Sequence, residues 1–141
     1  MSEAEVVAFL AEERLVSVAT VGPGGRPHLV PLWYASEGLD VVGWTYGASQ
    51  KVRNLERDPR ATIQVEAGET YEELRGVMME CDVEIVRDPA RTADLGMALF
   101  ARHGNDDPGM REVAVKQARK RVGLRFHPTR IVSWDHRKLQ A

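Results

Sequence analysis

The spacing of apolar residues changes several times along the chain, and each change marks a new element. In residues 3–13 the apolar side chains recur at helical spacing among glutamates, and Ser2 precedes them, which predicts a short amphipathic helix with a serine N-cap. Residues 15–21 are rich in β-branched side chains, and a glycine-rich turn separates them from a second apolar run over residues 28–35. This order predicts two antiparallel strands joined by a tight turn.

The rest of the chain alternates between strand and helix patterns. We expect strands at residues 41–46, 61–65, 74–86, 122–126 and 130–134, and helices at residues 49–57, 89–102 and 110–119. Residues 127–129 are expected to join the last two strands. The total is six or seven strands and three or four short helices, and tight turns connect most neighbours. This count favours a mainly β protein, a small antiparallel barrel decorated by helices, over a parallel sheet.

Composition narrows the class of protein. A length of 141 residues with 43% apolar and 28% charged residues indicates one globular domain over residues 1–141. The net charge of −2 disfavours a nucleic-acid binder that works through bulk positive charge. No apolar run approaches the roughly 20 residues of a membrane span. The acidic N-terminus differs from signal and transit peptides, so we expect a cytoplasmic protein.

Familiar catalytic and metal-binding motifs are absent. The single cysteine, Cys81, excludes an internal disulfide and a cysteine-based zinc knuckle. The chain lacks Gly-X-Ser-X-Gly and His-Glu-X-X-His, and its four histidines include no i, i+4 pair, so no metal site and no catalytic residue are predicted. The glycine-rich segment 22–25 lies between two strands, whereas a phosphate loop opens a helix, so we interpret it as a hairpin turn.

Residues 43–55 form the strongest candidate for a ligand-binding segment, because a strand ends, a small-residue loop follows and a helix begins. The first N–H groups of a helix lack partners, and the helix dipole places partial positive charge there. The hydroxyls of Thr45 and Ser49, with Lys51 and Arg53, would complete a cradle for a phosphate ester. An ordinary surface helix capped by Ser49 explains the same pattern equally well.

A second segment of interest is Val30-Pro31-Leu32-Trp33-Tyr34. Proline within a strand indicates an edge strand or an interrupted ladder. Such a ladder leaves backbone N–H and C=O groups free to bind the edge of a flat heterocycle, and Trp33 and Tyr34 add aromatic surface. Packing in the core is the alternative for either aromatic residue.

These segments carry a family resemblance. Residues 18–21, 25–34 and 51–60, in this order, resemble the flavin- and deazaflavin-dependent oxidoreductases with a split β-barrel, within the wider pyridoxamine 5′-phosphate oxidase-like superfamily. The pattern Lys-X-X-Asn-Leu-X-X-Asp-Pro-Arg at residues 51–60 is the most specific part. Residues 130–139 are similar to the tail of the actinobacterial branch, and the ratio of 15 arginines to 4 lysines is consistent with an actinobacterial source that uses coenzyme F420.

The resemblance spans residues 5–139 and implies a homodimer with two cofactor sites at the subunit interface. It implies that the loop before the helix holds the cofactor phosphate, that the backbone of the proline-containing strand faces the ring system, and that residues of the long strand and the tail reach the partner's site. The implied cofactor-binding residues are Val30, Pro31, Leu32, Trp33, Thr45, Ser49, Gln50, Lys51, Asn54, Arg75, Trp134 and Lys138. Trp44 and Tyr46 depart from the family pattern by placing two bulky rings beside the phosphate loop.

The resemblance implies a coenzyme F420-dependent reductase, in which the reduced deazaflavin gives a hydride to an activated double bond of a small organic substrate. Two alternatives stay open. One is an FMN-binding relative of pyridoxamine phosphate oxidase, and the other is a non-catalytic protein that holds a flavin, a tetrapyrrole or a fatty ligand. F420 and FMN both carry phosphate on a ribityl chain, so the cradle alone does not separate them. Tyr34 and His28 are the candidate proton donors.

Overall fold

The computed structural model describes residues 1–140, and Ala141, the last residue of the expected domain, lies outside them. Its helices and strands are, in chain order, α1 (Glu3–Glu12), β1 (Leu15–Val21), β2 (Pro27–Trp33), β3 (Ala35–Glu37), β4 (Asp40–Tyr46), α2 (Gln50–Arg57), β5 (Arg60–Ala67), β6 (Arg75–Val86), α3 (Pro89–Arg102), α4 (Arg111–Ala118) and β7 (Arg121–Asp135). The mainly β class with seven strands and four short α-helices is confirmed for the described residues. Within them, no helix has the length and apolar character needed to cross a membrane.

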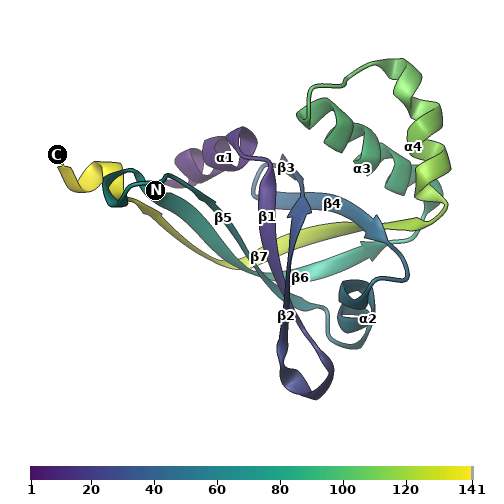
Figure 1. Cartoon of the computed structure of the whole chain (residues 1–141), viewed down its shortest axis with the longest axis horizontal. Coiled ribbons are helices and arrows are strands. Elements are labelled where there is room, and N and C mark those ends of the chain that lie inside the picture. The colour runs from purple at the N-terminus through teal and green to yellow at the C-terminus, as the bar shows by residue number, and fades with distance from the viewer. Residues whose placement is uncertain (141) are drawn as a thin grey trace.

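The strands form one antiparallel sheet in the order β2-β1-β5-β6-β7-β4-β3. The two edge strands, β2 and β3, follow each other in the chain through Tyr34, so the sheet curls into a barrel that is split along one seam. In Figure 1, α1 lies above the barrel and α2 below it, α3 and α4 pack together beside β4, and an arm of β5, β6 and β7 extends toward the C-terminus. The expected split β-barrel is confirmed.

The interior of the barrel is filled by the alternating inward side chains of β1, β5 and β6. Both flanking helices add apolar residues to the same core, and the buried set includes Phe9, Leu10, Val16, Val18, Val52, Leu55, Ile63, Val65, Val77 and Met79. Ser2 caps α1 as expected, because its Oγ accepts a hydrogen bond from the Glu5 N–H at 3.2 Å. Because Val52 and Leu55 belong to this core, α2 is fixed against the barrel, and this contact fixes the position of the loop before the helix.

The expectation of two final strands joined at residues 127–129 is wrong, because β7 runs unbroken through these residues. Its pairing with β6 shifts by one residue after Glu80, and Pro128 lies opposite Cys81. Thr129 is the extra residue of this β-bulge, and its hydroxyl donates a hydrogen bond to the Glu80 carbonyl at 3.1 Å. A bulge accommodates proline, which has no N–H for the ladder, so the strand bends instead of ending.

The second expected strand, residues 28–35, is divided at Tyr34 into β2 and β3. The Tyr34 N–H donates to the Arg14 carbonyl at 3.1 Å, and its hydroxyl donates to the Leu10 carbonyl at 2.8 Å. These bonds turn the side chain into the core, where it is fully buried. Burial raises the pKa of Tyr34 well above its usual value. Tyr34 therefore adds no aromatic surface to a ring site, which corrects that expectation, and its environment opposes release of its proton.

Candidate functional site

The loop between β4 and α2 brings Thr45 and Lys51 into contact. The Lys51 ammonium donates a hydrogen bond to the Thr45 hydroxyl at 2.7 Å. Thr45 is buried and Lys51 is half-buried, and burial lowers the pKa of Lys51 below its usual value. Across residues 1–140 no carboxylate lies within ion-pair distance of this ammonium. A charge held in this way without a counterion is expected to attract an anion.

Ser49 occupies the N-cap position of α2 but does not act as a capping side chain. Its backbone is extended, as a cap requires, yet its hydroxyl forms no bond to the first turn of the helix. The Ser49 Oγ is buried and has no hydrogen-bond partner among the described residues. The interpretation of an ordinary capped helix therefore does not describe this loop. Because an unpaired buried hydroxyl costs about 1–3 kcal/mol, it points to a partner supplied by a ligand.

Asn54 joins α2 to the barrel. It is fully buried, and its Nδ2 donates to the Thr20 hydroxyl at 3.0 Å while its Oδ1 accepts from Gln50 Nε2 at 2.8 Å and Arg57 Nη2 at 3.3 Å. The protein itself thus satisfies the side chain of Asn54, which holds the helix in place. Gln50 is exposed and uses its Nε2 in this network, and its role toward a coenzyme stays a prediction. His28 lies opposite Thr20 on β2, and its Nδ1 is buried without a partner in the described part of the chain.

The expected ring-facing strand is an edge strand, because β2 pairs with β1 alone. Val30 and Leu32 are half-buried toward the barrel, whereas Pro31 and Trp33 are exposed on the other side. The strand also approaches β4 closely: a Cβ added to Gly43 would lie 3.2 Å from both the Leu32 side chain and the Trp33 carbonyl oxygen. Leu32 and Trp33 therefore border the seam of the split barrel opposite Gly43, and Val30 and Pro31 continue the same edge strand.

The remaining expected site residues lie at the other end of the molecule. Arg75 and Lys138 form ion pairs with two glutamates of α1, at 3.2 and 2.9 Å, and the Trp134 ring lies directly against Gly76 of β6. Figure 1 shows this arm at the opposite end of the long axis from α2. A single chain thus brings Thr45, Ser49 and Lys51 together but leaves Arg75, Trp134 and Lys138 away from them.

A cavity of about 320 Å³ opens between β2, β4 and α3, and we call it the aromatic cavity. Its lining residues are Leu32, Trp33, Trp44, Thr45, Tyr46, Leu99, Phe100, His103 and Arg121. Sequence reasoning noted Trp44 and Tyr46 beside the loop but did not place α3 against them. The sequence marks this contact only by a glycine, Gly96, inside a helical segment, and it does not identify the partner. The structure does: a Cβ at Gly96 would lie 2.3 Å from the Trp44 ring.

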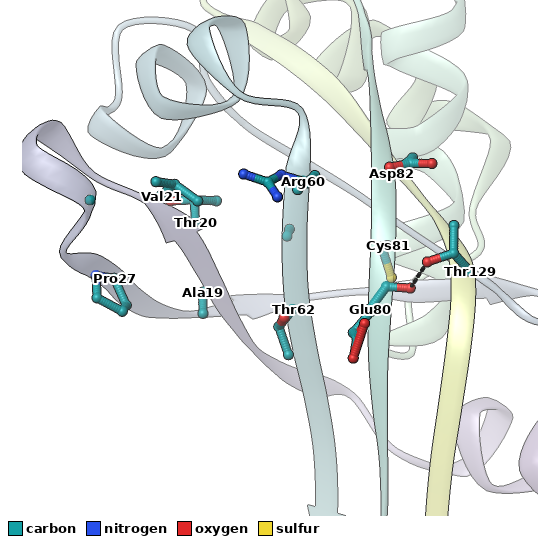
Figure 2. Close-up of a pocket in the computed structure, with 12 residues that line it drawn as sticks. Ala19, Thr20, Val21, Pro27, Arg60, Thr62, Glu80, Cys81, Asp82 and Thr129 are labelled. Carbon is teal, nitrogen blue, oxygen red and sulfur yellow. Dashed lines mark hydrogen bonds between the residues drawn. The ribbon is translucent and has the colours of Figure 1, made fainter.

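A second cavity, of about 380 Å³, lies on the outer side of the sheet, and we call it the sheet-face hollow. Figure 2 shows its lining side chains, which come chiefly from β1, β5, β6 and β7: Ala19, Thr20, Val21, Gly25, Pro27, Arg60, Ala61, Thr62, Glu80, Cys81, Asp82 and Thr129. The one cation of this set, Arg60, is paired with Asp58 at 2.7 Å, and Glu80 is paired with Arg130 at 3.0 Å. The charge of Arg60 is therefore already compensated by Asp58, so the loop at Lys51 is the better anion site.

Comparison with known proteins identifies relatives of the chain. Residues 2–135 match the family model described as pyridoxamine 5′-phosphate oxidase. A conserved hypothetical protein of Mycobacterium tuberculosis, Rv2991, is 40% identical over 100% of this chain and 89% of its own, with a TM-score of 0.94. No curated protein matches the chain.

More distant solved structures share the fold. An F420 reductase is 23% identical over 89% of this chain and 94% of its own, with a TM-score of 0.69. The heme storage protein HutZ of Vibrio cholerae is 18% identical over 94% of this chain and 93% of its own, with a TM-score of 0.72. At these identities the likeness concerns the fold.

Proposed function

Because the chain belongs to the pyridoxamine 5′-phosphate oxidase family, we propose that it is an oxidoreductase that binds coenzyme F420 and reduces an activated double bond of a small organic substrate. The observation that carries this proposal is the half-buried Lys51 ammonium, which has no carboxylate partner within residues 1–140 and lies two residues from the unpaired hydroxyl of Ser49. A phosphate ester on a coenzyme side chain would satisfy both groups. The distant fold relative described as an F420 reductase supports the choice of a deazaflavin.

The residues present fit a phosphate-bearing coenzyme. Lys51 and Ser49 would hold the phosphate, Thr45 would fix the position of the Lys51 ammonium, and the seam beside Val30 and Leu32 would receive the ring system. The bound coenzyme would supply the hydride chemistry. The chain itself would bind, orient and partly shield the coenzyme from water. Tyr34 is buried in the core, so it is not placed to act as an acid or base at the seam.

We propose that the active unit is a homodimer formed through the outer side of β1 and β2. Leu29 and Trp33 of β2 are 67% and 60% exposed, and Leu15, which pairs with Trp33 in the ladder, is 52% exposed. Exposed apolar patches of this kind mark protein contacts. In such a dimer the arm that carries Arg75, Trp134 and Lys138 would reach the partner's coenzyme, although one chain alone does not bring these residues to its own loop.

The test of the proposed function is a direct titration of the purified protein with F420, with FMN and with haem, each followed by fluorescence. We expect F420 to bind with a Kd below about 100 μM and more tightly than FMN. Tighter binding of FMN would favour the flavin alternative, and tight binding of haem alone would favour a tetrapyrrole carrier. If none of the three binds below about 100 μM, the coenzyme proposal fails.

A second measurement addresses turnover. We expect the protein to oxidise reduced F420 when an enone or a nitro compound is added, and not in its absence. Binding of F420 without oxidation across such a panel would assign the protein to coenzyme binding rather than to catalysis.

A further inference from the structure

The aromatic cavity lies beside the proposed phosphate site and shares only Thr45 with it. We propose that this cavity holds the organic substrate, and that the substrate is a planar, largely apolar molecule with one anionic group. The inference rests on the proposed function, since a substrate is here the reaction partner of the bound coenzyme. The planar part of the ligand would stack on the aromatic rings of the lining, and its anionic group would pair with Arg121. These rings belong to Trp33, Trp44, Tyr46 and Phe100.

The walls of the cavity are already fixed in place. The Trp44 ring meets Phe100 edge to face, with centroids 5.8 Å apart, and it rests on Gly96, where a Cβ would lie 2.3 Å from the ring. On the other side, Trp33 stacks on His103 with centroids 3.7 Å apart and planes 18° apart. Flat rings held by packing offer stacking surface with little loss of side-chain freedom on binding.

The charge of the cavity is positive and uncompensated. The Arg121 guanidinium lies 4.4 Å from the Tyr46 ring centroid and 5.0 Å from that of Trp44, and its Nη1 donates to the Gln117 carbonyl at 3.3 Å. None of the lining residues is acidic, and within residues 1–140 no carboxylate pairs with Arg121. Arg121 is therefore the cation that the lining residues offer to an anionic group on a ligand.

The surroundings of His103 agree with this charge. Burial lowers the pKa of His103, and the nearby charges of Arg14 and Arg102 lower it further. The imidazole is therefore neutral near pH 7, which suits its stack on Trp33 and leaves Arg121 as the charged group of the lining. A ligand with an anionic group, rather than a cation, is favoured on this side of β4.

The position of the cavity connects it to the coenzyme site. Thr45 lines the cavity and also accepts the hydrogen bond from Lys51, while Leu32 and Trp33 line both the cavity and the seam. A ligand here would thus lie next to a ring system held along β2. The volume of about 320 Å³ is at the lower end of the roughly 300–1,000 Å³ typical of small-molecule sites. It accommodates a molecule of a few rings and not a second coenzyme with its side chain.

The experiment uses two fluorescent probes that share their rings and differ in charge: 8-anilinonaphthalene-1-sulfonate, which is anionic, and N-phenyl-1-naphthylamine, which is neutral. Both are titrated into the wild-type protein and into Arg121→Gln. We expect the variant to bind the sulfonate about tenfold more weakly and the neutral probe with unchanged affinity. Arg119→Gln, which removes an exposed cation two residues away, is the matched control and should change neither affinity. Circular dichroism confirms that both variants are folded.

The outcomes separate this inference from the proposed function. Equal binding of the sulfonate by the wild type and Arg121→Gln overturns the inference, whatever the coenzyme result. With F420 bound at saturation, we expect the sulfonate affinity to stay within about twofold of its value without coenzyme. Displacement of the sulfonate by F420 would also overturn it, because the cavity would then belong to the coenzyme. Failure of F420 and FMN to bind removes the proposed function, and with it the assignment of the cavity to a substrate.

Discussion

Lys51 carries a positive charge that no carboxylate within residues 1–140 neutralises. Its ammonium has one hydrogen-bond partner, Thr45, and is half-buried. We expect Lys51→Ala to weaken coenzyme binding ten- to hundred-fold, about 1.5–3 kcal/mol, because a charge-assisted phosphate contact is lost. Isothermal titration calorimetry measures the change, and Lys116→Ala, an exposed lysine of α4, serves as the control. An unchanged Kd would place the phosphate elsewhere.

The same lysine should give coenzyme binding a pH dependence. Burial lowers the pKa of Lys51, and phosphate binding requires its charged form, so affinity should fall as the pH rises through this lowered pKa. In the coenzyme-free protein the sign is opposite: the unfolded state binds the proton more tightly, so the contribution of Lys51 to stability increases as the pH rises through the same window. Measuring Kd from about pH 7 to about pH 10 tests this. In Lys51→Ala, which has no ammonium to titrate at this position, the affinity should decline less over the same range.

Cys81 illustrates how burial controls reactivity at a single residue. Its thiol is 3% exposed, lies 3.8 Å from the Met79 carbonyl oxygen, and has its pKa raised to about 12 by burial and by two nearby aspartates. Because the thiolate is the reactive form, we expect the native protein to resist a disulfide reagent near pH 8. The urea-unfolded chain should react fully within the same assay. Rapid reaction of the native protein would show that the core around Cys81 opens to the reagent.

At the level of elements, Arg102 connects α3 to the rest of the fold. Its guanidinium donates to the Leu10 carbonyl at 2.7 Å and to Ser36 Oγ at 3.0 Å, and lies 5.3 Å from the Tyr34 ring centroid. We expect Arg102→Met to lower the free energy of unfolding by about 1.5–3 kcal/mol, since these acceptors lose a charged donor. Urea denaturation measures the loss. Arg91→Met, which removes an exposed ion pair of the same helix, should cost less than about 1 kcal/mol.

Most elements are predictable from the sequence because their signals are local. The β-branched run of β1 and the helical spacing of α1 after Ser2 gave the correct bounds within about two residues. The errors occur where a contact between residues distant in the sequence determines the local structure. The local sequence predicts that a strand ends at Pro128, but the bulge opposite β6 lets β7 continue. Tyr34 leaves its strand because it donates hydrogen bonds to the carbonyls of Arg14 and Leu10.

The candidate site follows the same division. The loop that joins Thr45 to Lys51 spans few residues, so the spacing alone placed both side chains near one helix start. The aromatic cavity needs α3, which follows β4 by more than forty residues, and no local pattern positions it. Whether Arg75, Trp134 and Lys138 reach a coenzyme site depends on the whole molecule, because a single chain does not bring them to the site that the resemblance implies.

The proposed dimer accounts for that separation, and one substitution tests it. Leu29→Arg places a charge at the centre of the exposed face of β2, where desolvation on association would be costly. We expect light scattering after gel filtration to give twice the chain mass for the wild type and the single chain mass for the variant. Val115→Arg, on the exposed face of α4, should remain a dimer. Because the arm would no longer reach a partner's site, the monomeric variant should also bind F420 more weakly. A wild type that runs as a monomer at every concentration, or a Leu29→Arg protein that stays dimeric, would refute this interface.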